Sequence, residues 1–222
     1  MSVPLQHTKL LNAAAREVLR PLGVTQKGRS RTWLDDRGWW LGVIEFQPSD
    51  WARGSYLNVG VNWLWNPKDY LSRDFGGRVD GVGHGLVRYE SDEQFSPLAR
   101  ELAMIAAEQA RGYRDLFPTI DACARELRKA KPRQLSRSLD AGVALGLAGD
   151  TPAAREMFGR YLAWFESDEG LEWRNDHDEA TYKRVQLLSA LAQDVPTFRR
   201  RIREDVYDAR ARLKLPPVEL PF

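Results

Sequence analysis

Apolar residues near the start of the chain recur at the spacing of an amphipathic helix: Leu10, Leu11, Ala14, Val18 and Leu19. The segment RPLG, residues 20–23, ends this run. The period then changes to two, which predicts strands over 31–35, 39–47, 55–65 and 85–90. The turn-forming residues DDRG separate the first two strands and predict a hairpin. The pattern therefore predicts an N-terminal helix followed by an antiparallel sheet of about four strands.

From about Asp92 the pattern is helical to the end of the chain. A long helix is predicted to begin near Leu98 and to kink or break at Pro118. Further helices are predicted over about 133–148, 152–166, 179–192 and 196–213. The order of helix, antiparallel sheet and helices is that of an α+β fold, because a doubly wound fold would alternate strands with helices.

The helical part contains a repeat. LAGDTPAAR, residues 147–155, and LAQDVPTFR, residues 191–199, match with an offset of 44 residues. In each copy a helix ends, an Asp-x-Pro turn follows, and the proline occupies the first turn of the next helix, where its missing N–H costs nothing. Gly142, Ala154 and Phe158 have a spacing similar to that of a tetratricopeptide-type hairpin.

Two such copies predict two stacked helical hairpins rather than a free-standing solenoid. We therefore divide the chain into an α+β domain, residues 1–130, and a tetratricopeptide-like helical-hairpin region, residues 131–222. The last eight residues, LPPVELPF, are predicted to be an extended tail whose apolar side chains lie in a groove of this protein or of a neighbour.

Two polar residues interrupt the segment with the strongest strand pattern. Residues 31–51 hold four of the eight tryptophans, yet Glu45 and Gln47 lie among them. Alternation resolves this, because it places Trp40, Ile44 and Phe46 on one face and the two polar residues on the other. The next strand repeats the pattern, with Val59 and Val61 on the apolar face. We predict a sheet that helices bury on one face and leave open on the other.

The open face is predicted to combine aromatic, carboxylate and amide side chains, which can orient hydrogen bonds to a partner. The predicted partner-binding residues are Trp39, Glu45, Gln47, Tyr56, Asn58, Asn62 and Arg88, with Arg31 as a further candidate on this face. The simpler interpretation is that the face is polar only because water lies against it.

Residues 19–65, LRPLGVTQKGRSRTWLDDRGWWLGVIEFQPSDWARGSYLNVGVNWLW, resemble the domain of unknown function 4304 family. The similarity lies in a leading helix, the entry LGV-x-QKGR-xx-TW into the sheet, a strand ending IEFQPS, and a second strand G-x-YLNVGV. The resemblance implies an α+β fold, and it assigns no catalytic residue. It does not extend to the helical hairpins after residue 130.

Charge and cysteine content exclude several classes of protein. The net charge is only +2, and the 33 basic and 31 acidic residues are interspersed, which argues against a strong nonspecific field for phosphates. The single cysteine, Cys123, excludes an internal disulfide framework and a cysteine-based zinc site. No apolar run reaches the ~18 residues of a membrane span, and the first residues lack an export signal pattern. We therefore expect a cytoplasmic protein without a membrane partner.

No motif assembles a catalytic, metal or cofactor site. His7, His84 and His177 are widely separated, and the GVGHG run around His84 lacks the Gly-Lys-Ser/Thr of a phosphate loop. NDHDEATY, residues 175–182, is better suited to cap the following helix than to bind a metal. Neither a Gly-x-Ser-x-Gly elbow nor a His-Glu-x-x-His pair occurs. We expect no cofactor.

Three hypotheses for function remain. The leading one is a non-enzymatic protein-interaction module, for example an immunity-like or regulatory subunit, that binds through the sheet face or the concave side of the hairpins. The alternative is an enzyme with a cleft between sheet and helices that uses Glu45 with His84 or Arg88. The third is nucleic-acid binding through the arginines of FRRRIREDVYDARARL, residues 198–213, for which i,i+4 pairing with the intervening acids is the simpler explanation.

Overall fold

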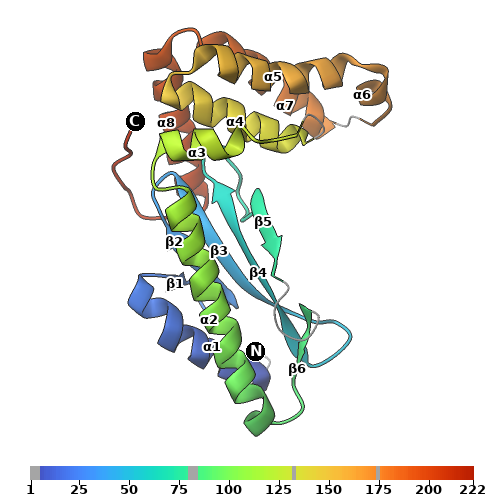
Figure 1. Ribbon diagram of the computed structural model, residues 1–222, viewed down its shortest axis with the longest axis vertical. Helices are drawn as coiled ribbons and strands as arrows, with labels where there is room; N and C mark the ends of the chain where they lie inside the picture. The colour runs from blue at the N-terminus through green and yellow to red at the C-terminus, as the bar shows by residue number, and fades with distance from the viewer. Residues whose placement is uncertain (1–5, 80–84, 132–133, 174–175) are drawn as a thin grey trace. The chain divides into compact units, whose positions relative to one another are not determined.

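The computed structural model of the protein describes residues 6–79, 85–131, 134–173 and 176–222, and the side chains of 173–177 are excluded from the description (Figure 1). Its fold is α+β, as predicted. The backbone packs into two compact units, Met1–Asn62 with Tyr70–Asp115, and Trp63–Asp69 with Leu116–Phe222. The division into an α+β domain, residues 1–130, and a helical-hairpin region, residues 131–222, stays a prediction.

In the residues that the structure describes, the first unit contains a helix, a six-stranded antiparallel sheet and a second, long helix. Its elements are α1 (Gln6–Leu19), the 3-10 turn η1 (Arg20–Leu22), β1 (Thr25–Gln26), β2 (Thr32–Asp36), β3 (Trp40–Pro48), β4 (Gly54–Trp63), β5 (Phe75–Arg78), β6 (Val87–Arg88) and α2 (Asp92–Leu116). The strand order is β1-β2-β3-β4-β5, and β6 also pairs with β4. The sheet therefore has more strands than the predicted four. The additional ones, β1 and β5, are two and four residues long and too short for a hydrophobic alternation to reveal them.

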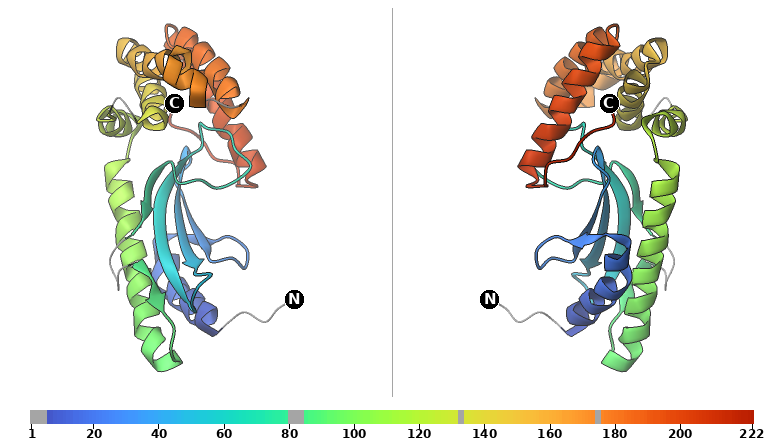
Figure 2. Two further views of the ribbon diagram at one scale, coloured as in Figure 1. Left: turned by 90° about the vertical axis from the view of Figure 1, so that its right-hand side faces the viewer. Right: turned by 90° about the vertical axis from the view of Figure 1, so that its left-hand side faces the viewer.

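One face of this sheet packs against both helices of the unit, α1 and α2 (Figure 2). The strands contribute Trp33, Ile44, Phe46, Leu57, Val59 and Val87 to this core. Helix α2 contributes mainly small residues: Ala99, Ala103, Ala106, Ala107 and Ala110. Because alanine side chains are short, the long helix can lie close to the sheet and bury the large aromatic and branched residues of the strands.

A buried ion pair connects α2 to β2. The Arg114 guanidinium donates from Nε and Nη2 to the two carboxylate oxygens of Asp35 at 2.7 and 2.9 Å. Its Nη2 also donates to the Leu22 carbonyl at 2.8 Å. Bonding to Asp35 raises the pKa of Arg114. The two parallel bonds satisfy a carboxylate that is otherwise enclosed on the core side, so this polar position is compatible with burial.

The second unit is helical and contains the predicted Asp-x-Pro turns. Its helices are α3 (Ile120–Leu127), α4 (Leu135–Ala148), α5 (Thr151–Glu166), α6 (Asp168–Trp173), α7 (Asp176–Leu191) and α8 (Val195–Arg212). The interruption predicted at Pro118 is confirmed, because α2 ends at Leu116 and α3 begins at Ile120. Asp150 and Asp194 cap α5 and α8, and each is followed by a proline in the first turn.

Helices α4 and α5 approach closely at Gly142. A Cβ atom added to this glycine would lie 2.5 Å from the ring of Phe158 on α5. The missing side chain therefore makes room for the phenyl ring, and the ring itself is fully buried. None of the helices in the described part of the chain is long and apolar enough to cross a membrane.

Candidate functional site

The face of the sheet opposite α1 and α2 carries polar side chains, as alternation predicts. In β4, Leu57 and Val59 belong to the helix-covered core, so Tyr56 and Asn58 point to the other side. In β3, Ile44 and Phe46 lie in the same core. The neighbouring Glu45 and Gln47 therefore share the outer face with Asn58, and neither of the two helices described in this unit covers that face (Figure 2).

Hydrogen bonds and one cation–π contact connect six side chains on this face, and we call them the outer-face cluster: Glu45, Gln47, Tyr56, Asn58, Arg73 and Arg78. Asn58 lies at its centre and is buried beneath its neighbours. Its amide Nδ2 donates to Gln47 Oε1 at 2.8 Å and to Glu45 Oε2 at 3.3 Å. Arg78 donates from Nε to Asn58 Oδ1 at 3.4 Å and from Nη2 to Gln47 Oε1 at 3.0 Å. Asn58 therefore uses both its amide donor and its amide acceptor, whereas Gln47 Oε1 accepts from both Asn58 and Arg78.

The two arginines of the cluster come from the segment after β4. The guanidinium of Arg78, on β5 opposite Asn58, lies 4.0 Å from the ring centroid of Tyr56, in a cation–π contact. Arg73 Nη1 donates to Glu45 Oε2 at 2.9 Å, and about a third of each of these side chains is exposed. Gly60 allows this approach, because a Cβ atom there would lie 3.0 Å from Arg73 Cβ.

Sequence reasoning missed both arginines. Arg73 lies in a loop and Arg78 ends a short strand, FGGR, that has no hydrophobic alternation. The only signal in the sequence was a basic residue in the glycine-rich segment after a long two-faced strand. Pairing of β5 with β4 then brings Arg78 beside residues that lie about 20 to 30 positions earlier.

Three of the predicted residues do not lie on an open surface. Trp39, Asn58 and Asn62 are buried, so the expectation that they are exposed is wrong. Trp39 lies in the turn before β3, with its ring 6.2 Å from that of Trp40. Asn62 Oδ1 accepts the Ser72 N–H at 3.0 Å, and so fixes the loop that leads to β5. Alternation gives the direction of a side chain, and other side chains and loops then decide its exposure.

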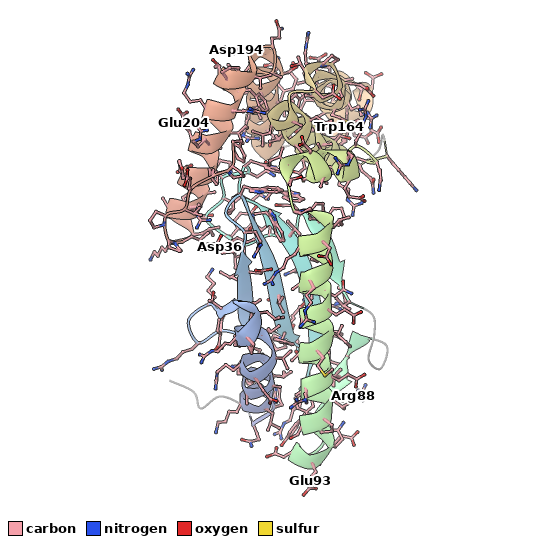
Figure 3. The ribbon with its side chains drawn as sticks, turned by 60° about the vertical axis from the view of Figure 1, so that its left-hand side comes forward. Asp36, Arg88, Glu93, Trp164, Asp194 and Glu204 are labelled. Atoms are coloured by element: carbon pink, nitrogen blue, oxygen red, sulfur yellow. The ribbon has the colours of Figure 1, made fainter. Side chains whose placement is uncertain are left out.

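Arg88 lies on the predicted face but away from the outer-face cluster. It pairs with Gly54, four residues before Asn58 on β4, which corresponds to roughly 13 Å along the strand. Figure 3 shows it toward the end of the sheet where α2 begins. Arg88 is exposed and, like Arg78, has no carboxylate partner within ion-pair distance among the described residues. The open part of this face therefore carries an excess of positive charge.

The enzyme hypothesis required Glu45 beside His84 or Arg88. His84 lies outside the described residues. Arg88 pairs with Gly54, four residues along β4 from Asn58, the neighbour of Glu45. The Glu45 carboxylate instead accepts hydrogen bonds from Arg73 and Asn58. Across the residues that the structure describes, there is no cluster of histidine, cysteine and acidic side chains suited to a metal. Cys123 is buried, and burial raises its pKa well above the usual value, as expected of an inert thiol.

The arginines of α8 largely bind the chain itself. Arg199 donates to the Leu147 carbonyl at 3.0 and 2.8 Å, and Arg203 donates to the Phe222 carbonyl. Arg210 is almost fully buried and donates from Nε to the Pro216 carbonyl at 3.2 Å. The tail thus packs against its own unit, and Leu220 is buried. Of the two predicted arrangements, a groove of this protein or of a neighbour, the structure has the first. These contacts reduce the number of guanidinium groups that a nucleic acid could use.

Comparisons with known proteins give no assignment. No profile of a known family, no curated protein and no solved structure matches this chain. The resemblance of residues 19–65 to the domain of unknown function 4304 family stays a prediction from the sequence, and the function must be argued from the site geometry.

Proposed function

We propose that the protein is a non-enzymatic interaction module that binds another protein through the outer-face cluster. The observation that carries this proposal is the fixed presentation of Arg78. Its guanidinium stacks on Tyr56 and donates to two amide side chains, Gln47 and Asn58. A side chain that is already ordered loses little rotamer freedom on binding, so it contributes more of its interaction energy to affinity.

The composition of the cluster suits a protein partner. Arginine and tyrosine are enriched at interface centres, and most of the binding energy of an interface comes from a few such residues. Tyr56 supplies an apolar ring, while Gln47 and Asn58 limit the freedom of the guanidinium beside it. An immunity-like or regulatory subunit would need a preformed surface of this kind, because such proteins act by occupying their partner.

The partner is expected to present carboxylates to this surface. Arg78 and Arg88 lack a carboxylate partner among the described residues, and the Arg73–Glu45 pair is partly exposed. Complementary charge increases the rate of association and fixes the orientation of the partner more than it increases affinity. Binding should therefore weaken as salt is raised, through slower association.

The test begins with co-purification of the tagged protein from its native cells and identification of the bound protein by mass spectrometry. The affinity of that protein is then measured for the wild type, Arg78→Met and Arg111→Met. Arg111 is exposed on α2, the helix that packs on the other face of the sheet, and provides a matched loss of charge. We expect Arg78→Met to weaken binding by about tenfold or more and Arg111→Met to leave it unchanged. Equal affinity of wild type and Arg78→Met would contradict the proposal.

A further inference from the structure

A cavity of about 320 Å³ opens in the first unit, away from the outer-face cluster. Its volume is at the lower end of the range for small-molecule sites. Its wall is formed by α1, by Arg31 directly before β2, and by the connection between β3 and β4. The polar and aromatic side chains that line it are His7, Arg31, Ser49, Asp50, Trp51 and Arg53.

Arg31 is the best-fixed cation of this cavity. Arg31 lies two positions before the buried Trp33, so its side chain is on the same, helix-covered side of the sheet. The prediction that it lies on the outer face is therefore wrong. Its Nη2 lies 3.1 Å from His7 Nε2 and donates to the hydroxyl of Thr8. Its Nη1 is buried and has no hydrogen-bond partner among the described residues. Burial lowers the pKa of Arg31.

His7 acts as an acceptor that orients this guanidinium. The imidazole is buried, with its centroid 5.6 Å from that of Tyr89 and 6.2 Å from that of Phe95. Burial, followed by the charges of Arg31 and Arg53, lowers the pKa of His7 below its usual value. A neutral imidazole can accept at Nε2 from the Arg31 N–H. His7 is therefore a positioning residue, because its Nε2 already accepts from Arg31 and is not available to a ligand.

The charges of the cavity do not cancel. Arg31 and Arg53 supply two positive charges against the single carboxylate of Asp50, and Asp50 forms no ion pair with either arginine. Arg53 is exposed, and no hydrogen bond from its side chain is found among the described residues. A partly buried guanidinium without a counter-ion is unfavourable, because desolvation of the charge is not compensated.

The rim carries an unusual apolar residue. Trp51 is 93% exposed in the connection between β3 and β4, and it is one of the residues at the cavity. An isolated exposed indole next to two arginines gives the site a flat apolar surface beside a positive one. This pairing suits a molecule that carries an anionic group on an aromatic or apolar body.

We propose that this cavity binds the oxyanion group of a small molecule, a carboxylate or a phosphate, with Arg31 and Arg53 as its ligands and Trp51 against its organic part. Guanidinium groups suit this role because their planar donors match both oxyanions. The site is independent of the outer-face cluster, so its failure would leave the proposed function unaffected.

The test is calorimetric titration of the full-length protein, at low ionic strength, with inorganic phosphate, phenyl phosphate and benzoate. Binding of either phosphate probe or of benzoate supports the proposal. Comparison of the affinities for phenyl phosphate and benzoate identifies which oxyanion, phosphate or carboxylate, the cavity prefers. We expect Arg31→Met to weaken the binding by about tenfold or more. Arg29→Met is the matched control, because Arg29 is exposed two positions earlier and does not line the cavity.

Two further variants keep the test decisive if Arg31→Met fails to fold. Arg53 is exposed and holds no other side chain in place, so Arg53→Met should fold and bind the probe several-fold more weakly. Asp50→Asn removes the one negative charge of the wall and should strengthen binding. The proposal is overturned if the wild type binds none of the three probes at about 10 mM, a concentration that detects even millimolar affinity. Unchanged binding by both arginine variants would overturn it as well.

The role of Trp51 has its own readout. Stacking of phenyl phosphate on this indole should change the tryptophan fluorescence of the wild type. The change should be lost in Trp51→Phe, while the affinity for inorganic phosphate is retained, since phosphate alone contacts only the arginines. A fluorescence change that persists in Trp51→Phe would show that the organic part of the ligand does not lie against Trp51.

Discussion

Asn58 is the residue on which the outer-face cluster depends. Its amide contacts Glu45, Gln47 and Arg78 and is almost fully withdrawn from water. A buried amide that lost these partners would leave unsatisfied groups on both sides. At this scale the polar face is therefore a connected network of side chains, in which removal of one member affects the geometry of the others.

Replacement of Asn58 by alanine should destabilise the protein by about 1–3 kcal/mol, because the hydrogen bonds of a buried amide to its partly exposed partners are lost. Urea unfolding of Asn58→Ala, followed by circular dichroism, measures this loss. Gln193→Ala serves as the control, since Gln193 is exposed and no side-chain hydrogen bond is found for it among the described residues. Equal unfolding free energies for the two variants would show that the network contributes nothing to stability.

His7 should make stability dependent on pH. Its pKa in the folded protein is lowered from 6.5 by burial and by Arg31 and Arg53. The unfolded chain therefore binds a proton more readily, and the contribution of His7 is complete above pH 6.5 and lost as the pH falls through the lowered folded-state pKa. We expect the loss of unfolding free energy between pH 7.5 and pH 5.5 to be smaller in His7→Gln than in the wild type. An identical loss in both proteins would argue against a neutral, acceptor histidine.

At the scale of elements, the long strands were predictable and the short ones were not. β3 and β4 are nine and ten residues long, so their alternation determines which side chains face the helices. β1 and β5 form because they pair with an existing strand, and no periodicity within them signals this. Arg78 depends on that pairing, which is why the sequence indicated Glu45, Gln47 and Asn58 but not their cationic partner.

Helix boundaries in the second unit followed local chemistry. The Asp-x-Pro turns at Asp150 and Asp194 supply a side-chain acceptor and a residue that needs no N–H, so both helix starts could be located from the sequence. The burial of Asn62 and Trp39 could not be predicted from local sequence, because it depends on which distant segments cover these residues. Local signals predict where an element begins, and tertiary packing decides what covers it.

Two glycines in adjacent helices should respond oppositely to alanine. Alanine normally stabilises a helix interior by about 0.5–1 kcal/mol relative to glycine. At Gly159 of α5 no atom lies within 4 Å of an added Cβ, so Gly159→Ala should be neutral or stabilising. At Gly142 the added Cβ would collide with the Phe158 ring, so Gly142→Ala should destabilise the protein. Thermal unfolding compares the two, and a similar rise in Tm for both would contradict the close packing of α4 and α5.

At the scale of the whole molecule, the arginines divide by what they bind. Arg199, Arg203 and Arg210 donate to main-chain carbonyls within their own unit. Arg78 and Arg88 occupy the outer face of the sheet, where a partner can reach them. The small net charge of +2 conceals this difference, because it counts every arginine equally. Charge composition alone therefore could not predict where a partner would bind.

The most direct test of the central claim is site-specific photocrosslinking in the native cells. The photoreactive aromatic residue p-benzoylphenylalanine replaces Tyr56 in the outer-face cluster or, as the control, the exposed Tyr207 of α8. Both positions hold a tyrosine, so the change in side chain is the same. We predict that position 56 crosslinks one specific protein and that position 207 does not. Crosslinking of a specific protein from position 207 alone, or from neither position, would contradict binding through the outer-face cluster.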